Sequence, residues 1–266
     1  MTSPMTAAAN ASVAPEPTSL PVRATPGPTR ATPDPTQATP GPTQSTPDRF
    51  FVRRVYCVGR NYAEHAREMG GDPNREPPFF FTKPADAVYA VAEGVSAEGI
   101  APGTVPYPPQ TANLSHEIEL VVAIGTGGRD IDPVDALDHV VAYGVGVDLT
   151  RRDLQDAAKQ QRRPWDLSKG FDYSGPVSEL VPAGVAGHPD AAPIWFDVDG
   201  VRRQTGDLAD QIWSVAEIVA ALSSFVELRP GDLVFTGTPA GVGALVVGDS
   251  AAGGIGGLAE IAFTVV

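Results

Sequence analysis

Three carboxylates lie at positions from which they could hold one metal ion. Glu117 and Glu119 are two residues apart in an apolar, β-branched run at 114–125 that has the composition of a strand. Side chains two apart on a strand project from the same face, so the two carboxylates are expected side by side. Asp148 follows the next strand-like run, at 140–147. Three converging carboxylates favour a hard divalent cation, Mg²⁺ or Mn²⁺. The alternative is that Glu117 and Glu119 form the solvated face of an edge strand.

A second pair of chemically capable residues lies on a short predicted helix at 61–69. His65 and Glu68 are three apart and therefore share a helix face, where Glu68 could orient the imidazole and stabilise its charge. Such a pair could activate water as a general base, although a His/Glu pair is also common on helix surfaces. Gly70 and Gly71 are expected to end this helix.

Two cationic residues follow Asp148 in the chain. Arg152 offers a bidentate fork to a carboxylate, or a plain salt bridge to a neighbouring acidic residue. Lys169 lies among large apolar residues, which is less usual than a lysine in a charged run. His116 is expected on the strand face opposite Glu117, in a structural role.

The first 48 residues are predicted to stand apart from the folded body as a disordered arm. They hold 11 of the 27 prolines and repeat a seven-residue unit at 24–30, 31–37 and 38–44. Such a segment buries too little apolar surface to offset the entropy of ordering it, and it favours polyproline II. We see neither a signal peptide nor an apolar stretch of membrane-spanning length.

The remaining residues, 49–266, are expected to form a single catalytic domain. About −12 of the formal net charge of −13 belongs to this part, because the first 48 residues hold two arginines and three acidic residues. That balance argues against nucleic acid or an anionic membrane as a partner. The lone cysteine, Cys57, lies in an apolar run and is expected to be buried, which suits a reducing cytoplasm.

The body is predicted to have an α+β, mainly β fold, because short strand-like runs outnumber helical patterns. The expected strands are at 54–58, 87–92, 117–124, 140–147, 193–199, 232–236 and 259–266. The expected helices are at 61–69, 150–160 and 214–225, the last with a capping box of Ser214 and Glu217. The glycine-rich loop 237–243 lacks the ending of a phosphate-binding loop, so we expect its backbone amides to face another kind of ligand.

Six sequence blocks in order resemble the fumarylacetoacetate hydrolase family, and most closely its short acylpyruvase and fumarylpyruvate hydrolase members. The resemblance spans nearly all of 54–266. The blocks are VGRNYAEH at 58–65, FFFTKP at 79–84, HEIEL at 116–120, DLTRRDLQ at 148–155, PWDLSKGFD at 164–172 and TGTPAGVG at 236–243. Relatives often have a histidine at the position of Ser115, which is a mild departure because His116 is present.

The resemblance implies a mixed β-sandwich roll, a homodimer, and a site that binds Mg²⁺ or Mn²⁺. It places the metal ligands at Glu117, Glu119 and Asp148. It also implies a catalytic dyad on a lid that closes over the substrate. It assigns this dyad to His65 and Glu68, and it matches Arg152, Gln155 and Lys169 to positions that line the site. We expect Lys169 to act in catalysis with the dyad, and Arg152, Gln155 and Thr238 to bind the substrate.

The expected activity is metal-dependent hydrolysis of a carbon–carbon bond in a 2,4-dioxo acid (an acylpyruvate), such as fumarylpyruvate giving fumarate and pyruvate. Two alternatives are an oxaloacetate decarboxylase and an isomerase of unsaturated 2-oxo dioic acids. A third is a binding module without turnover. Arg162 and Arg163 could bind a distal carboxylate of the substrate, or could form a solvated basic patch.

Overall fold

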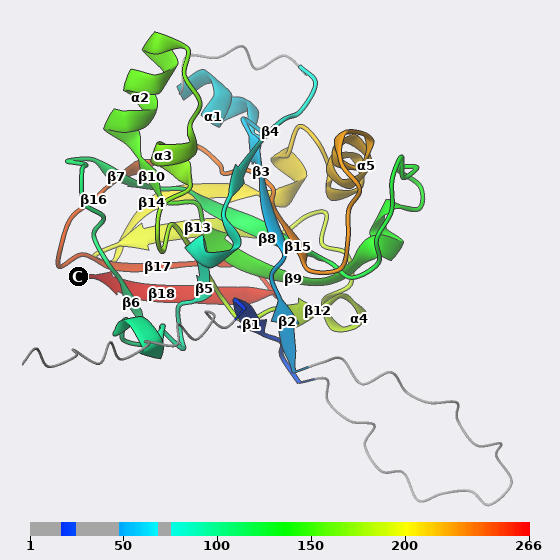
Figure 1. Ribbon diagram of the computed structural model, residues 1–266, viewed down its shortest axis with the longest axis horizontal. Helices are drawn as coiled ribbons and strands as arrows, with labels where there is room; N and C mark the ends of the chain where they lie inside the picture. The colour runs from blue at the N-terminus through cyan, green and yellow to red at the C-terminus, as the bar shows by residue number, and fades with distance from the viewer. Residues whose placement is uncertain (1–16, 25–47, 69–75) are drawn as a thin grey trace, which may run out of the picture.

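The largest element of the structure, a computed structural model that describes residues 17–24, 48–68 and 76–266, is an eight-stranded mixed sheet (Figure 1). Its strands follow the order β4-β3-β15-β8-β9-β11-β5, with β12 beside β9. The pairs β3–β15 and β5–β11 are parallel. The strands are β3 (Arg54–Gly59), β4 (Phe79–Lys83), β5 (Val88–Ala90), β8 (Ile118–Ile124), β9 (Val140–Val147), β11 (Gly175–Val177), β12 (Val181–Pro182) and β15 (Asp232–Phe235).

A five-stranded sheet packs against one face of the large sheet, in the order β14-β13-β17-β18-β6. Its strands are β6 (Thr104–Val105), β13 (Pro193–Val198), β14 (Val201–Asp207), β17 (Ser250–Ile255) and β18 (Ala259–Val265). Leu120 and Val122 of β8 belong to one buried cluster with Phe196 of β13, while Val121 and Ala123 belong to another. The large sheet is therefore buried on both faces, which explains the uninterrupted apolar run at 120–124 of β8.

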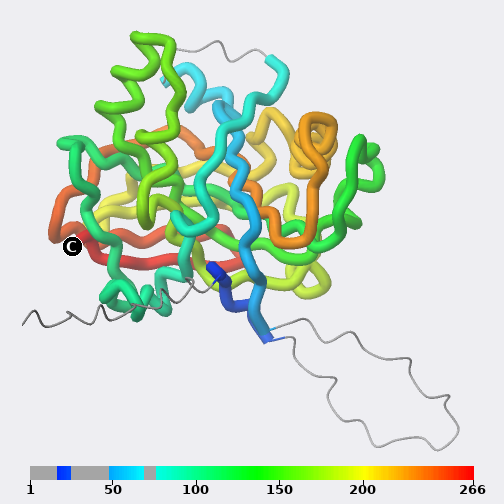
Figure 2. The backbone as a smooth tube through the Cα atoms, viewed as in Figure 1, coloured from blue at the N-terminus to red at the C-terminus, as the bar shows by residue number. Residues whose placement is uncertain are grey.

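Three helices gather at one end of the sheets, as Figure 1 shows: α1 (Ala63–Glu68), α2 (Arg152–Gln161) and α3 (Asp166–Lys169). The backbone trace in Figure 2 shows that these segments, although far apart in sequence, come to the same end of the molecule. A small sheet in the order β10-β7-β16 contains β7 (Leu114–His116), β10 (Thr150–Arg151) and β16 (Gly243–Leu245). The remaining helices are α4 (Ala183–Ala186) and α5 (Val215–Phe225).

The α+β, mainly β fold class is confirmed, and each predicted strand and helix is present. The strand at 140–147 has the predicted bounds, and the other elements have shifted ends. The predicted helix at 150–160 begins at Arg152, because Thr150 and Arg151 pair with β7. Ser214 and Glu217 form the predicted capping box of α5. No helix among the described residues is long and apolar enough to cross a membrane.

Strands β14 and β17 were not predicted from the sequence, for two different reasons. The edge strand β14 is polar and mostly exposed, so it lacks the apolar alternation that marks a half-buried strand. Strand β17 is built mainly from alanine and glycine, and these residues have low strand propensity. Both strands form because their neighbours in the five-stranded sheet supply the packing.

Part of the predicted disordered arm belongs to the fold. Strand β1 (Ser19–Pro21) pairs antiparallel with β2 (Arg49–Phe51), and Leu20 is fully buried in a core cluster. The prediction that residues 1–48 stand apart is therefore wrong for residues 17–24, because one large apolar side chain and a strand partner anchor them. The rest of the predicted arm, 1–16 and 25–47, lies outside the described residues.

The buried Leu20 side chain should stabilise the fold. Replacing a buried leucine by alanine removes apolar contacts and leaves a cavity, so Leu20→Ala should lower the free energy of unfolding by about 2–5 kcal/mol. The measurement is urea unfolding of the full chain. Leu167→Ala is the matched control, because Leu167 is 76% exposed and its loss should change stability by less than about 0.5 kcal/mol. Equal effects of the two substitutions would contradict the anchoring role of β1.

Candidate active site

The three predicted carboxylates converge in the interior of the protein. One oxygen from each of Glu117, Glu119 and Asp148 lies within 4.8 Å of the others, and all three side chains are buried. Glu119 is on β8, and Asp148 directly follows β9, the antiparallel partner of β8. Burial of all three groups contradicts the alternative of a solvated edge strand.

Glu117 occupies a different backbone position from the one predicted. The expected strand at 117–124 begins at Ile118, and Glu117 lies in the break between β7 and β8. Its carbonyl oxygen accepts a hydrogen bond of 2.8 Å from the backbone N–H of Asp148. The break still directs the Glu117 carboxylate to the same cluster as Glu119.

Two buried lysines contact the acidic cluster. Lys169, on α3, donates hydrogen bonds of 2.7 Å to Glu117 Oε2 and 2.7 Å to Asp148 Oδ2. Lys83, on β4, lies with its Nζ 2.8 Å from Asp148 Oδ1 and also donates to Ser174 Oγ and to the Lys169 carbonyl. Lys83 was not predicted as a site residue, and the only sequence signal was its place in the FFFTKP block.

Arg152 supplies a third positive charge from the first turn of α2. Its guanidinium donates to Glu117 and, at 2.7 Å, to Gln155 Oε1. The alternative was a plain salt bridge of Arg152 to Asp153 or Asp156, and neither is found among the described residues. Asp153 accepts from Thr111 Oγ1 and the Ala112 amide, and Asp156 lies 3.7 Å from Lys159 Nζ.

The two glutamates experience opposite environments. Burial raises the pKa of Glu117, but Lys169 and Arg152 outweigh it and hold this pKa well below its ordinary value. Burial raises the pKa of Glu119 well above its ordinary value, and the neighbouring charges of Asp148 and Glu117 raise it further. Among the described residues no cation lies within ion-pair distance of Glu119, which accepts only a 2.6 Å hydrogen bond from the Gly237 amide.

The predicted His65–Glu68 pair faces the same region. His65 Nδ1 lies 3.3 Å from Glu68 Oε2, and the Glu68 carboxylate also accepts from the Gly241 amide at 3.2 Å. Burial lowers the pKa of His65, so the imidazole is neutral near pH 7. The glycines predicted to end this helix, Gly70 and Gly71, lie outside the described residues.

The glycine-rich loop after β15 holds side chains of the site with its backbone. Gly237 has φ +96°, and a side chain there would lie 2.7 Å from the Cβ of Asn61. The sequence predicted loop amides that face a ligand, whereas the Gly237 and Gly241 amides donate to the two carboxylates Glu119 and Glu68.

His116 has the structural environment predicted for it. Its ring stacks on Phe196 at 4.6 Å, and its Nδ1 lies 2.8 Å from Gln204 Oε1. Gln204 also donates to Thr238 Oγ1 at 2.7 Å, so it connects His116 to a residue of the glycine-rich loop.

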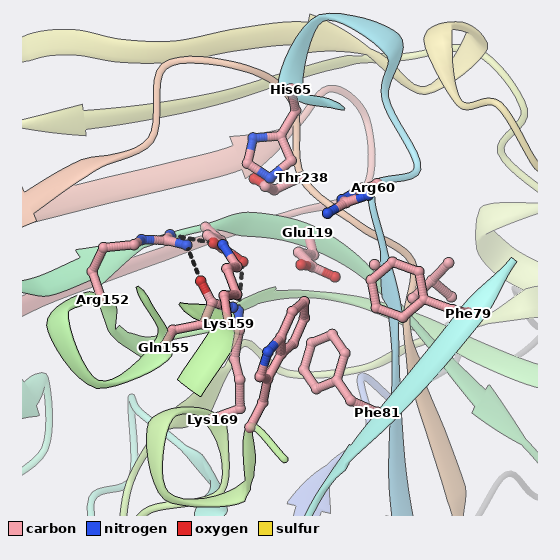
Figure 3. A pocket seen from close by; sticks show the side chains of 14 residues that line it. Arg60, His65, Phe79, Phe81, Glu119, Arg152, Gln155, Lys159, Lys169 and Thr238 are labelled. Atoms are coloured by element: carbon pink, nitrogen blue, oxygen red, sulfur yellow. Dashed lines mark hydrogen bonds and ion pairs between the residues drawn. The ribbon is translucent and has the colours of Figure 1, made fainter. Parts of the chain in front are cut away.

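One cavity brings most of these groups together (Figure 3). Seven of the nine predicted site residues line it, and the other two, Glu68 and Asp148, contact lining residues. Arg162 and Arg163 do not line it. Sequence reasoning missed a group of cationic and aromatic lining residues: Arg60, Phe79, Phe81, Lys159 and Trp165.

The chain is similar to proteins of known family. The fumarylacetoacetate (FAA) hydrolase C-terminal profile matches residues 54–266. The crystal structure of fumarylpyruvate hydrolase from Pseudomonas aeruginosa in complex with Mn²⁺ and pyruvate has a TM-score of 0.82 and 51% sequence identity, covering 97% of this chain and 99% of that chain. Fumarylpyruvate hydrolase from Ralstonia sp. is 42% identical over 195 residues, which are 73% of this chain and 95% of the relative.

A relative with a different activity is also similar. Oxaloacetate tautomerase FAHD1 from Arabidopsis thaliana is 38% identical over 212 residues, covering 80% of this chain and 90% of the relative. The family profile extends from β3 to the last residue of the chain. Sequence identities of 38–51% are higher than those between proteins that share only a fold. This chain therefore belongs to the fumarylacetoacetate hydrolase family and is an enzyme.

Proposed function

We propose that this enzyme hydrolyses a carbon–carbon bond in 2,4-dioxo acids, with fumarylpyruvate giving fumarate and pyruvate as its main reaction. The observation that carries the proposal is that His65 lines the same cavity as Glu117 and Glu119, two members of the buried carboxylate cluster. Such a site could hold a 2-oxo acid through a metal and activate water beside it. Similarity to fumarylpyruvate hydrolases supports the choice of substrate.

The acidic cluster fits a divalent metal, and we propose Mg²⁺ or Mn²⁺. Its donors are all carboxylate oxygens, which suit hard cations. Glu117 and Asp148 already have cationic partners, whereas Glu119 is buried with a strongly raised pKa and would gain one from the metal. Glu117, Glu119 and Asp148 would hold the ion. When bound, the metal supplies a Lewis acid for the 2-oxo acid end of the substrate.

His65 is the proposed general base. The Nδ1–H group of His65 would donate a hydrogen bond to Glu68 Oε2, which leaves Nε2 free to take a proton from water. The resulting hydroxide attacks C4 of the dioxo acid, the C3–C4 bond breaks, and its electron pair leaves with C3 as the enolate of pyruvate. Protonation of that carbon gives pyruvate, and the acyl group leaves as fumarate.

Four further residues are proposed to act on the reacting molecule. Lys169 lies between Glu117 and Asp148, where its ammonium would stabilise negative charge that develops on the enolate. Arg152 and Gln155 are fixed to one another and line the cavity, as does Thr238. We propose that Arg152, Gln155 and Thr238 contact the substrate.

Oxaloacetate chemistry is the second candidate function. The similarity to an oxaloacetate tautomerase favours it, and oxaloacetate is also a 2-oxo acid that three carboxylates and a metal could hold. Decarboxylation needs no activated water, so the His65–Glu68 pair favours the hydrolase over a decarboxylase. Tautomerisation is a proton transfer that could use the same base, so substrate consumption must separate it from hydrolysis.

We also propose a homodimer, on the basis of the family resemblance. Light scattering on the purified chain tests it. A reducing cytoplasmic location is proposed because the single cysteine, Cys57, is buried and has no partner for an internal disulfide.

Fumarylpyruvate should be consumed in a metal-dependent reaction. Loss of the dioxo-acid enol absorbance, with pyruvate and fumarate appearing in equal amounts, is expected with Mn²⁺ or Mg²⁺ and should stop with EDTA. Restoring the metal should restore the rate. No turnover with any divalent metal would contradict the proposed reaction, and oxaloacetate would then be the next substrate to test.

Replacing His65 by alanine should separate hydrolysis from oxaloacetate chemistry. Loss of the general base should lower kcat for fumarylpyruvate by about 10²- to 10⁴-fold. Any oxaloacetate decarboxylation by the wild type should persist in His65→Ala, because it needs no activated water. His139→Ala is the matched control, since His139 hydrogen-bonds the Thr126 carbonyl and does not line the cavity. A proportional loss of both activities would count against His65 as the water-activating base.

The raised pKa of Glu119 predicts a pH-dependent stability of the metal-free protein. The folded state holds this proton to a higher pH than the unfolded chain does, so stability falls as pH rises from the ordinary carboxyl pKa towards the raised value. Glu119→Gln removes this dependence. The unfolding free energy of Glu119→Gln minus that of the wild type should therefore increase with pH. Its total increase across this pH range should be about 1.4 kcal/mol for each unit by which the pKa of Glu119 is raised. Urea unfolding in EDTA from pH 5 to 8 measures this difference, and a pH-independent difference would contradict the prediction.

A further inference from the structure

The cationic side chains that line the cavity fall into two pairs. Arg152 and Lys169 are both engaged by the buried Glu117 carboxylate, and Lys169 by Asp148 as well. Their charges therefore already compensate the acidic cluster. The other two, Arg60 and Lys159, do not contact that cluster.

Arg60 and Lys159 have little or no competing carboxylate. Within the described ranges, no acidic side chain lies within ion-pair distance of Arg60. The Lys159 ammonium is 3.7 Å from Asp156 Oδ1, a neighbour on α2 whose side chain is 53% exposed. A solvated pair of this length contributes little. Both side chains therefore have N–H donors available to a ligand.

An aromatic surface connects these two cations. The Arg60 guanidinium lies 5.8 Å from the ring centroid of Phe79, and Lys159 Nζ lies 5.5 Å from that of Trp165. The two rings contact each other edge to face at 5.6 Å. Cation–π contacts orient a cation without neutralising its charge. In the view of Figure 3, Arg60 and Lys159 lie on opposite sides of Glu119.

We propose that Arg60 and Lys159 form a subsite for a second carboxylate, at the far end of the acyl group of the substrate. This inference rests on the proposed function, in which the 2-oxo acid end of an acylpyruvate binds at the acidic cluster. The substrate class is then an acylpyruvate with a terminal carboxylate on a planar, unsaturated chain, which the rings of Phe79 and Trp165 would contact. Arg162 and Arg163, considered for this role from sequence, lie outside the cavity lining.

Electrostatics favour an anionic acyl group over a neutral one. A neutral acyl group such as acetyl would leave the charges of Arg60 and Lys159 in the cavity without a counter-charge. Burial and the nearby Arg152 charge lower the pKa of Lys159, which indicates that its ammonium lies in an unfavourable field. A carboxylate bound between Arg60 and Lys159 would relieve that field, and the Arg60 fork matches carboxylate geometry.

The test compares two substrates that differ in the distal carboxylate. Arg60→Met and Lys159→Met should each lower kcat/KM for fumarylpyruvate by about 10- to 100-fold, the range for loss of one charge-assisted hydrogen bond. The loss should lie mainly in KM, and the change for acetylpyruvate should stay within about threefold. Arg60→Lys should recover part of the fumarylpyruvate activity. Arg162→Met is the matched control and should leave the ratio of the two substrates unchanged.

The outcomes separate the subsite from the proposed function. Equal losses on both substrates, or no loss on either, would overturn the subsite while the hydrolase activity of the wild type stands. If the wild type consumes neither substrate, the proposed function is wrong. The subsite is then tested by measuring ligand binding. Calorimetry with Mn²⁺ and saturating pyruvate then compares fumarate with crotonate, which is planar and lacks the second carboxylate. At least tenfold tighter binding of fumarate that Arg60→Met removes supports the subsite, and absence of that preference overturns it.

Discussion

The site depends on one constraint, the burial of three carboxylates within 4.8 Å of one another. Removing a carboxylate from water costs several kcal/mol, and like charges at this distance repel, so such a cluster needs compensation. Lys83, Arg152 and Lys169 provide it from β4, α2 and α3. These three elements must therefore reach the same end of the sheets. Helix α3 has only four residues, and its position places Lys169 against the carboxylates.

The same compensation determines how the site treats an anionic substrate. Three carboxylates and one divalent ion alone sum to a net negative charge, which would repel a dioxo acid. The three cationic side chains reverse that sign when the metal is bound, so the centre that would bind the 2-oxo acid end is electropositive. Lys83 matters here because Arg152 and Lys169 by themselves leave a smaller positive balance. A residue without access to the cavity thus contributes to the electrostatic attraction of the substrate.

Local patterns in the sequence predicted the parts of the site that depend on local geometry. The spacing of His65 and Glu68 fixes their contact within one helical turn, and Asp148 meets Glu119 because β8 and β9 are antiparallel neighbours. Lys83, Lys159 and Trp165 were missed because no local pattern marks them, and only tertiary packing brings β4, α2 and the residue before α3 to the cavity or its carboxylates. Leu20 was assigned to a disordered arm because the prediction used the average composition of residues 1–48. That average does not reveal a single leucine that is buried in the core. Burial and contacts between residues far apart in sequence cannot be read from a short sequence segment. This explains both the missed site residues and the wrong assignment of Leu20.

Backbone amides, rather than side chains, set the relation between the carboxylate cluster and the proposed base. One short loop donates from Gly237 to Glu119 and from Gly241 to Glu68. Both glycines have φ near +95°, and a Cβ at Gly241 would collide with the carbonyl oxygen of Arg203. Other residues would strain this loop, so the glycines are required for its path. Because one loop donates to both Glu119 and Glu68, the fold fixes the position of the proposed metal-binding carboxylate relative to the partner of the proposed base, His65.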